Sequence, residues 1–309
     1  MRDPGLPTLD QLRVFLTVID TGGFAHAARH LFRTQSVISY TIANLEEQLN
    51  VVLFDRNKRK PTLTEAGKAL LADARAVSLK VDAMRARAKA LSEGLEAEVS
   101  LAVDVMYPTE ILVRLLEEFQ AQFPTVALRL RVEALGAVIQ LVLERVCHIG
   151  ISGFMIATPD PLERQSIGHI ELVPVAAPTH PLALEPIPIP TAIAREHTQL
   201  VLTDRSQLTA GQNFGVFAVR DWRLADMGAK HALLVAGLGW GNMPIAMVRD
   251  DLASGRLVRL SLVEAHTAPY PLHLIHRTDD PPGPAGKWLM EQFKQRAPSL
   301  MQPPAGRSV

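Results

Sequence analysis

The amino-terminal part of the sequence constrains the fold most strongly, because two short helical patterns meet there at a tight turn. Residues 25–31 and 34–40 form the two patterns, and Thr34 is a residue type that caps helices. An earlier helix is predicted by Leu12, Phe15, Leu16 and Ile19, which share one helix face, and residues 20–23 end it. This part of the chain therefore predicts a helix-turn-helix.

The third predicted helix has distinct inner and outer faces. Its inner residues are Ile38, Ile42, Leu45 and Leu49, which recur at spacings of four, three and four. The outer residues near its amino end can donate and accept hydrogen bonds to base edges in a major groove. We therefore predict DNA contacts from this end; they are Thr34, Gln35, Ser36, Ser39 and Tyr40. The alternative is an exposed helix face in another kind of small bundle.

A basic loop follows between two short apolar pairs, 53–54 and 62–63. This arrangement predicts a two-stranded wing whose cationic tip binds phosphate without reading sequence. The predicted phosphate contacts are Arg56, Lys58, Arg59 and Lys60. A solvated surface loop is the alternative.

Residues 9–71 resemble the winged helix-turn-helix of LysR-type transcriptional regulators. The resemblance rests on Phe15, Gly22-Gly23-Phe24, Ala27-Ala28, Gln35-Ser36, Ser39, Leu45-Glu46, Leu53-Phe54-Asp55-Arg56 and Leu63-Thr64-Glu65-Ala66-Gly67. Gly23 replaces the family's common Ser, and Tyr40 and Ala43 replace common basic residues. We therefore hypothesise that Tyr40 contacts a base or sugar and that the wing supplies more of the electrostatic affinity.

A long helix is predicted over residues 64–93, which are rich in Ala, Leu, Lys, Arg and Glu and lack Pro. Its apolar residues form one narrow stripe suited to another helix; they are Ala66, Leu70, Ala74, Val77, Val81, Met84, Ala88 and Leu91. The alternative is a helix lying on its own domain. The resemblance implies a linker helix that pairs subunits, in a homodimer or a homotetramer.

Strand and helix patterns alternate after Gly94, which predicts an α/β fold. Strands are predicted at 99–103, 126–132, 148–152, 172–177, 199–203, 214–219 and 272–275, and residues 178–190 are predicted to be a loop. Helices are predicted at 108–123, 136–145, 227–236, 244–252 and 287–296. The chain is expected to form two lobes that are linked by two crossings.

This part also resembles the LysR-type effector domain, whose two lobes are similar to type 2 periplasmic binding proteins. Residues 173–183, 236–244 and 250–260 carry the match, whereas 145–148 depart from the family pattern. The predicted domains are a winged helix-turn-helix at 1–63, a linker helix at 64–94 and an effector domain at 95–309. Its first lobe is predicted at about 95–165 and 269–309, and its second at about 166–268.

A small ligand between such lobes would meet the carboxyl ends of strands and the amino ends of helices. The residues predicted there are Met106, Tyr107, Thr109, Gly153, Phe154, Thr203, Asp204, Trp240 and Asn242. Ordinary lobe packing is the alternative for each of them. The apolar and aromatic residues among them favour an aromatic or neutral ligand over a small carboxylate.

Other chemistry is not indicated by the sequence. The single cysteine, Cys147, cannot close a disulfide within the chain. His273 and His276 would face opposite sides of one strand, so they cannot readily bind one metal ion. The glycine-rich residues 237–241 follow a predicted helix, which argues against a dinucleotide site. We therefore expect no enzyme activity, no cofactor and no metal.

The sequence as a whole predicts a sequence-specific transcription regulator controlled by a small-molecule effector. The lack of a long apolar run or signal peptide and the single cysteine predict a cytoplasmic protein with no membrane contact. The expected partners are double-stranded operator DNA, an effector, further copies of the chain and RNA polymerase. The alternatives are a ligand-processing enzyme with an accessory DNA-binding domain and a nucleoid binder without a preferred site.

Overall fold

The computed structural model describes residues 5–55, 61–153, 159–204, 206–209, 211–212, 214–263 and 269–297. The chain divides into two compact units, Met1–Lys89 and Ala90–Val309. Within the described ranges, no helix combines the length and the hydrophobicity that a membrane crossing requires.

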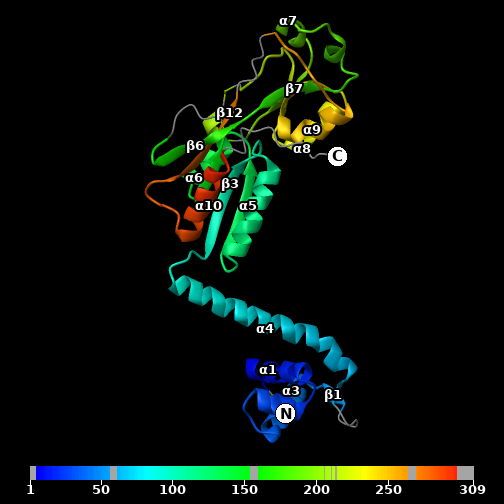
Figure 1. Cartoon of the computed structure of the whole chain (residues 1–309), viewed down its shortest axis with the longest axis vertical. Helices are drawn as coiled ribbons and strands as arrows, with labels where there is room; N and C mark the ends of the chain where they lie inside the picture. The colour runs from blue at the N-terminus through cyan, green and yellow to red at the C-terminus, as the bar shows by residue number, and fades with distance from the viewer. Residues whose placement is uncertain are drawn as a thin grey trace. The chain divides into compact units, whose positions relative to one another are not determined.

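The first unit is the predicted winged helix-turn-helix (Figure 1). Its elements are α1 (Leu9–Asp20), α2 (Phe24–His30), α3 (Gln35–Leu49), β1 (Phe54–Asp55) and β2 (Thr62–Leu63). The predicted inner residues Ile38, Ile42 and Leu45 are fully buried, and they pack in one core with Phe15. β1 and β2 pair antiparallel as the two strands of the wing.

The helix α4 (Glu65–Ser92) confirms the predicted long helix, and its first turn packs tightly against the wing. At Gly67, an added Cβ would overlap the backbone oxygen of Leu53 and lie 2.8 Å from a methyl carbon of Leu63. The absence of a side chain at Gly67 thus lets α4 approach the wing.

The substitution Gly67→Ala tests this steric constraint, because steric overlap and helix propensity predict opposite changes in stability. Propensity alone would stabilise the helix by about 1 kcal/mol, whereas overlap with the Leu53 carbonyl predicts a lower free energy of unfolding. Denaturant unfolding of the full chain measures the sign. A more stable variant would contradict the close approach.

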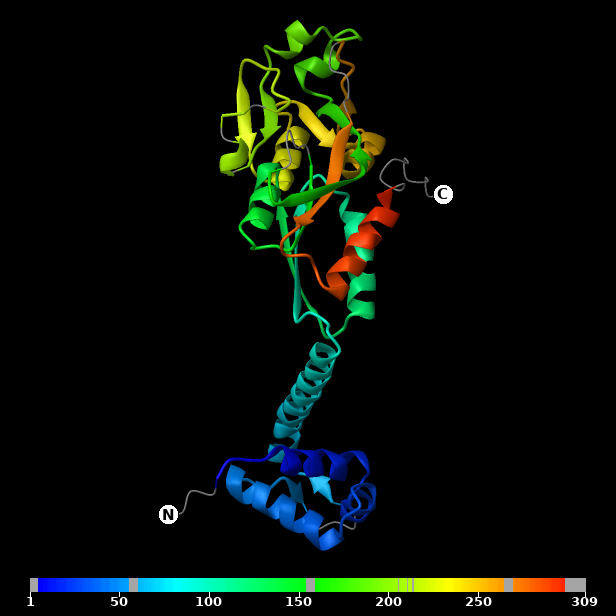
Figure 2. The same cartoon turned by 90° about the vertical axis from the view of Figure 1, so that its left-hand side faces the viewer.

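The first lobe of the second unit contains a five-stranded sheet in the order β4-β3-β5-β12-β6 (Figure 2). Its strands are β3 (Glu98–Asp104), β4 (Ala127–Glu133), β5 (Ile149–Ser152), β6 (Leu162–Ile170) and β12 (Tyr270–Arg277). β3 runs parallel to β4 and β5, whereas β12 runs antiparallel to β5 and β6. The β6–β12 pairing extends to Ile170, so this sheet includes residues beyond the predicted lobe limit at 165.

Helices cover both faces of this sheet. They are α5 (Thr109–Gln122), α6 (Gly136–Leu143) and α10 (Pro284–Gln295). Leu101 and Val103 pack in the core with α5 and α10, whereas Ala102 packs with α6. This alternation follows from side chains that point to opposite faces along a strand.

The second lobe contains two smaller sheets and short helices. Its strands are β7 (Leu172–Ala176), β8 (Gln199–Leu202), β9 (Asp221–Leu224), β10 (Gly241–Pro244) and β11 (Val258–Arg259). Its helices are α7 (Thr191–Ala194), α8 (Met227–Val235) and α9 (Ile245–Ser254), with 3-10 turns at Pro181–Leu184 and Gln207–Thr209. β7 lies between β10 and β11, and β8 pairs parallel with β9.

One predicted strand, residues 214–219, is wrong. Gly215, within this segment, adopts a positive φ angle of 65°, which interrupts extended backbone. The side chain of Gln199 accepts hydrogen bonds from the backbone N–H groups of Phe217 and Ala218, in place of a neighbouring strand. The strand of this segment is instead β9.

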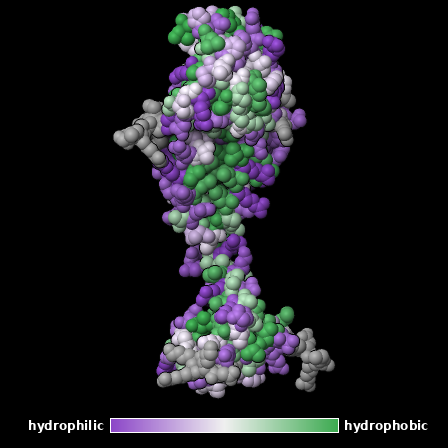
Figure 3. Space-filling view, turned by 90° about the vertical axis from the view of Figure 1, so that its right-hand side faces the viewer, coloured by the Kyte–Doolittle hydropathy of each residue, from purple (hydrophilic) through white to green (hydrophobic). Residues whose placement is uncertain are grey.

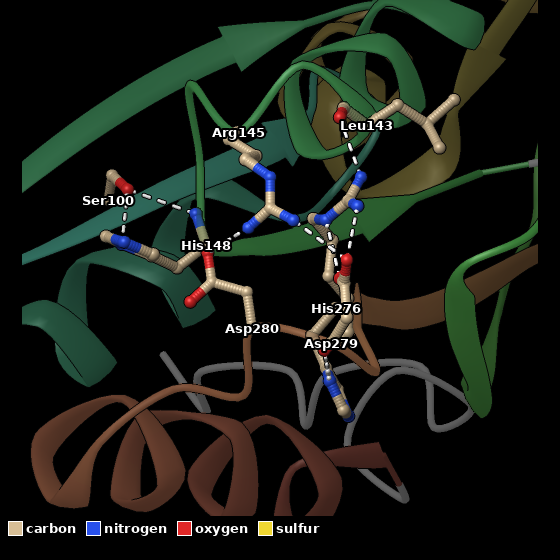
Figure 4. A network of polar contacts seen from close by, with 8 residues as sticks. Ser100, Leu143, Arg145, His148, His276, Asp279 and Asp280 are labelled. Carbon is tan, nitrogen blue, oxygen red and sulfur yellow. Dashed lines mark hydrogen bonds and ion pairs between the residues drawn. The ribbon is translucent and has the colours of Figure 1, made fainter.

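The loop after α6 contains the departure from the family pattern at Arg145 (Figure 4). Arg145 has a φ of 61° and ends the helix in a left-handed conformation. Its guanidinium forms ion pairs with Asp279 and Asp280 at 2.8 and 3.1 Å. Arg277 also contacts Asp279 and donates to the backbone oxygen of Leu143 at 2.8 Å. This network joins the end of α6 to the end of β12.

Candidate nucleic-acid interface and ligand site

The predicted reading residues lie on the outer side of α3. Thr34, Gln35, Ser36 and Tyr40 are exposed, and Ser39 is half-buried. The hydroxyl of Thr34 accepts from the backbone N–H of Val37 at 3.4 Å, as predicted for an N-cap. The core contacts of Ile38, Ile42 and Leu45 thus leave the polar residues of α3 facing solvent.

The turn before α3 is tied to α1 by Arg33. Its guanidinium donates two hydrogen bonds to the carboxylate of Asp10, at 2.7 and 2.8 Å. The hydrogen bonds from Arg33 hold the pKa of Asp10 below its usual value. A partly exposed pair adds little stability, but its two-point geometry fixes the direction in which the chain enters α3.

The wing strands have the predicted pairing, with Phe54 opposite Leu63 and Asp55 opposite Thr62. The predicted phosphate contacts Arg56, Lys58, Arg59 and Lys60 lie outside the described residues. Their assignment stays a prediction from the sequence.

Three of the predicted ligand contacts have side chains that are buried within the lobes. Met106, Tyr107 and Trp240 are 5%, 2% and 1% exposed, and their side chains belong to the cores of the lobes. Tyr107 packs edge-on against Phe293, with ring centroids 5.5 Å apart, and burial raises the pKa of its hydroxyl. The indole N–H of Trp240 donates to the backbone oxygen of Ala194. Their sequence positions were close to the predicted site, but their side chains turn inward.

Sequence reasoning missed Asp104, which lies at the end of β3 and joins residues next to β5 and β12 in the first lobe. Its carboxylate accepts from the backbone N–H groups of Met106 at 2.8 Å and Gly153 at 3.2 Å, and from the hydroxyl of Tyr270 at 2.9 Å. A side chain at Gly153 would overlap the Tyr270 ring. The only available signal was an acidic residue at the end of an apolar strand.

Thr203 and Asp204 line a small cavity at the carboxyl end of β8. Its other lining residues are Leu135, Val201, Leu202, Thr209, Gln212, Phe214, Val216 and Arg223. The cavity has a volume of about 20 Å³, which is close to the space of one water molecule. Leu135 belongs to the first lobe and the other residues to the second, so the cavity lies where the lobes meet.

The side chain of Asp204 is held close to the first lobe. Ser206 donates to its carboxylate at 2.6 Å, and Thr209 donates to the other carboxylate oxygen. A Cβ added at Gly136, the first residue of α6, would lie 2.8 Å from Thr209 and 3.1 Å from Asp204. The lobes therefore touch at this point, with no space for a further side chain.

Two of the remaining predicted ligand residues, Thr109 and Asn242, are not among the described residues that line this cavity. Thr109 is exposed at the start of α5, and Phe154 lies outside the described residues. The backbone oxygen of Asn242 accepts from the ammonium group of Lys230 at 2.7 Å. Burial lowers the pKa of Lys230 to about 8. Sequence reasoning missed this residue, although it stands on the apolar face of α8 between Met227 and Leu234.

Two family models match this chain. The LysR substrate binding domain matches residues 92–298, and the bacterial regulatory helix-turn-helix protein of the lysR family matches residues 9–68. The chain belongs to the LysR family of transcriptional regulators. It is therefore a LysR-type transcription regulator with a DNA-binding domain and an effector-binding domain.

Relatives of this LysR-type regulator are similar over most of their length. The uncharacterized HTH-type transcriptional regulator YeeY of Escherichia coli (strain K12) is 31% identical over 260 residues, covering 83% of this chain and 84% of YeeY. The HTH-type transcriptional activator AllS of Klebsiella pneumoniae is 28% identical over 257 residues, covering 81% of this chain and 93% of AllS. These names do not support the alternative of an enzyme with an accessory DNA-binding domain.

Solved structures share the fold at lower identity. A cysteine mutant of Corynebacterium glutamicum OxyR has a TM-score of 0.54 at 21% identity, covering 97% of this chain and 96% of that chain. Full-length LysG from Corynebacterium glutamicum with bound effector Arg has a TM-score of 0.51 at 18% identity, covering 96% of this chain and 100% of the LysG chain. They support the predicted fold of a helix-turn-helix followed by a two-lobed effector domain.

Asp104 predicts a pH dependence of stability. Burial raises its pKa from 3.8 to about 6, so the folded protein keeps the proton over a range in which the unfolded chain has lost it. From about pH 4 to pH 6, this group should lower the free energy of unfolding as pH rises, by about 3 kcal/mol at most. Asp104→Asn should flatten that decline in denaturant unfolding of the full chain.

The exposed Asp82 on α4 provides the control, because Asp82→Asn should leave the profile unchanged. If the free energy of unfolding of Asp104→Asn fell with pH as steeply as that of the unaltered protein, another group would cause the decline.

Proposed function

We propose that this LysR-type regulator binds operator DNA through the amino end of α3 and the wing. The observation that supports this most directly is the outward polar surface of α3, formed by Gln35, Ser36 and Ser39 behind a fully buried row of Ile38, Ile42 and Leu45. Gln can bond an adenine edge at two points, and Ser can bond several bases. Thr34 and Tyr40 complete the proposed reading surface, and Arg56, Lys58, Arg59 and Lys60 the proposed phosphate contacts.

We further propose that the protein acts as a homodimer or a homotetramer that pairs through α4. Val77, Met84 and Leu91 share the predicted apolar stripe and are 42%, 65% and 47% exposed. A large exposed apolar surface favours association. Two copies joined in this way would present two α3 helices to a symmetric operator.

An apolar hollow of about 180 Å³ lies beside this stripe on the first unit. Leu70, Ala74 and Val77 belong to both the stripe and the hollow, and the other lining residues are Pro7, Leu12, Phe15, Leu45, Leu49, Leu53 and Asp73. Figure 3 shows hydrophobic side chains gathered on the surface of this unit. A second copy of α4 has the apolar side chains to fill this hollow.

The effector is proposed to bind where the lobes meet, near Thr203, Asp204 and Gly153, with Thr109, Asn242 and Phe154 as outlying candidates. The cavity of about 20 Å³ is smaller than a metabolite. Binding therefore requires that the lobes separate near Asp204 and Gly136. An effector with higher affinity for the separated state would shift the population toward it.

Other parts of the proposal rest on the family and on the DNA-binding role. A transcription regulator acts where the chromosome and RNA polymerase are, so we propose a cytoplasmic location and a contact with RNA polymerase. We also propose domain limits of 1–63, 64–94 and 95–309, with lobes near those predicted from the sequence.

The self-association is tested by Met84→Glu. A charge at this point of the stripe should raise the dissociation constant of the pairing about tenfold or more, because each copy loses burial of one apolar side chain. Sedimentation over a concentration series measures this constant. Ala86→Glu places the same charge away from the stripe and should have little effect. Equal dissociation constants for both variants and the unaltered chain would contradict pairing through α4.

The role of the wing is tested by Lys58→Ala. If Lys58 neutralises a phosphate, its loss should make the slope of log affinity against log salt shallower by about one per contact. Binding of the full chain to its operator at several salt concentrations gives this slope. Lys287→Ala removes an equal charge from an exposed position on α10 and should leave the slope unchanged. An unchanged slope for Lys58→Ala would remove it from the phosphate contacts.

A further inference from the structure

Phe32 combines a strained backbone with an almost completely exposed ring. Among the described residues, the non-glycine residues with positive φ are Phe32 (55°), Asn50 (53°), Leu135 (50°) and Arg145 (61°). Asn adopts this conformation readily, Leu135 is 7% exposed within the core, and Arg145 pairs with Asp279 and Asp280. The ring of Phe32 is 97% exposed. Packing within this unit therefore does not compensate for its strain.

The position of Phe32 is one that normally selects glycine. It follows the end of α2, where its N–H donates to the backbone oxygen of Arg29 at 3.2 Å and the N–H of Arg33 donates to that of Ala28 at 2.9 Å. This pair of hydrogen bonds defines a Schellman motif, whose left-handed residue is most often Gly and sometimes Asn. A bulky aromatic residue is unfavourable there both for the backbone and for hydration of the ring.

The turn places Phe32 in the chain just before the reading end of α3. Phe32 lies two residues before the N-cap Thr34, and the neighbouring Arg33 is held to Asp10 at two points. On α3 itself, Val37 and Tyr40 are 45% and 69% exposed. Apolar side chains therefore accompany Gln35 and Ser36 at the end of the helix that enters a major groove.

The major groove offers one apolar group that such side chains can recognise. Thymine carries a methyl group at C5, and its contact with apolar side chains distinguishes thymine from the other bases. A ring that is exposed in the free protein would lose water-accessible apolar surface only in the complex. Strain at an exposed turn residue is also a common sign of a binding role.

We propose that Phe32, together with Val37, contacts thymine methyl groups in the operator. Each half-site then contains thymine opposite the amino end of α3. This inference rests on the proposed DNA-reading role of α3 and adds a base preference to it.

The test begins with an operator selected from random duplexes by the full-length protein. Each thymine of that operator is then replaced in turn by deoxyuridine, which lacks only the methyl group, and affinity is measured at one fixed salt concentration. For the unaltered protein, replacement at one symmetric pair of positions should lower affinity about fivefold or more. For Phe32→Asn, the same replacement should lower affinity clearly less than it does for the unaltered protein, because the Phe32 contact is already absent and the Val37 contact alone remains.

Phe32→Asn also separates the binding role from a structural one. Asn fits the left-handed conformation better than Phe, so this variant should unfold at the same or a higher temperature while it binds the selected operator more weakly. Leu184→Asn removes another exposed apolar side chain, 76% exposed on the second unit, and should change neither the affinity nor the deoxyuridine profile.

Three results would overturn the inference. Phe32→Asn could bind as tightly as the unaltered protein with the same deoxyuridine profile, which would exclude a contact from the ring. It could lose affinity equally for thymine and deoxyuridine duplexes, which would place the ring on the sugar-phosphate backbone. Failure of the unaltered protein to select any duplex would instead overturn the proposed DNA-reading function on which the inference rests.

Discussion

The burial of Ile38, Ile42 and Leu45 is the interaction on which the reading surface depends. A helix that buries one face has no freedom to rotate about its axis, so these contacts decide which side chains remain outside. The outer side of α3 then consists of Gln35, Ser36 and Tyr40 near the amino end. The N-cap at Thr34 and the two-point contact between Arg33 and Asp10 fix where that end begins. The core packing of α3 thus determines which of its side chains form the outer surface.

The first lobe of the second unit uses a buried carboxylate to join three of its strand ends. Asp104, at the end of β3, contacts Gly153, which follows β5, and Tyr270, which begins β12 after the return from the second lobe. A short distance away, Asp204 and Thr209 meet the start of α6 without free space. The Asp104 contacts lie within the first lobe, whereas the contact of Asp204 and Thr209 with α6 joins the two lobes and would break if they separated.

Much of the fold could be predicted because its signals are local. The spacing of Ile38, Ile42 and Leu45 and the capping type of Thr34 both follow from nearby residues. The strand β6 was missed because it contains polar residues and because its partner among the described strands, β12, is far away in the sequence. The strand expected at 214–219 failed because the side chain of Gln199 satisfies its backbone groups. The ligand site was harder to predict. Whether the side chains of Tyr107 and Trp240 point into the core depends on segments that are distant in the sequence, and so do the contacts of Asp104.

The central claim is that the outer side chains of α3 read bases. The most direct measurement compares the DNA sequences that the full-length protein and its Gln35→Ala variant select from the same random duplex library. We predict a symmetric preferred site for the unaltered protein, and for Gln35→Ala a loss of preference at one symmetric pair of positions with the rest of the site retained. Identical preferred sites for both proteins, or none for the unaltered protein, would contradict the account.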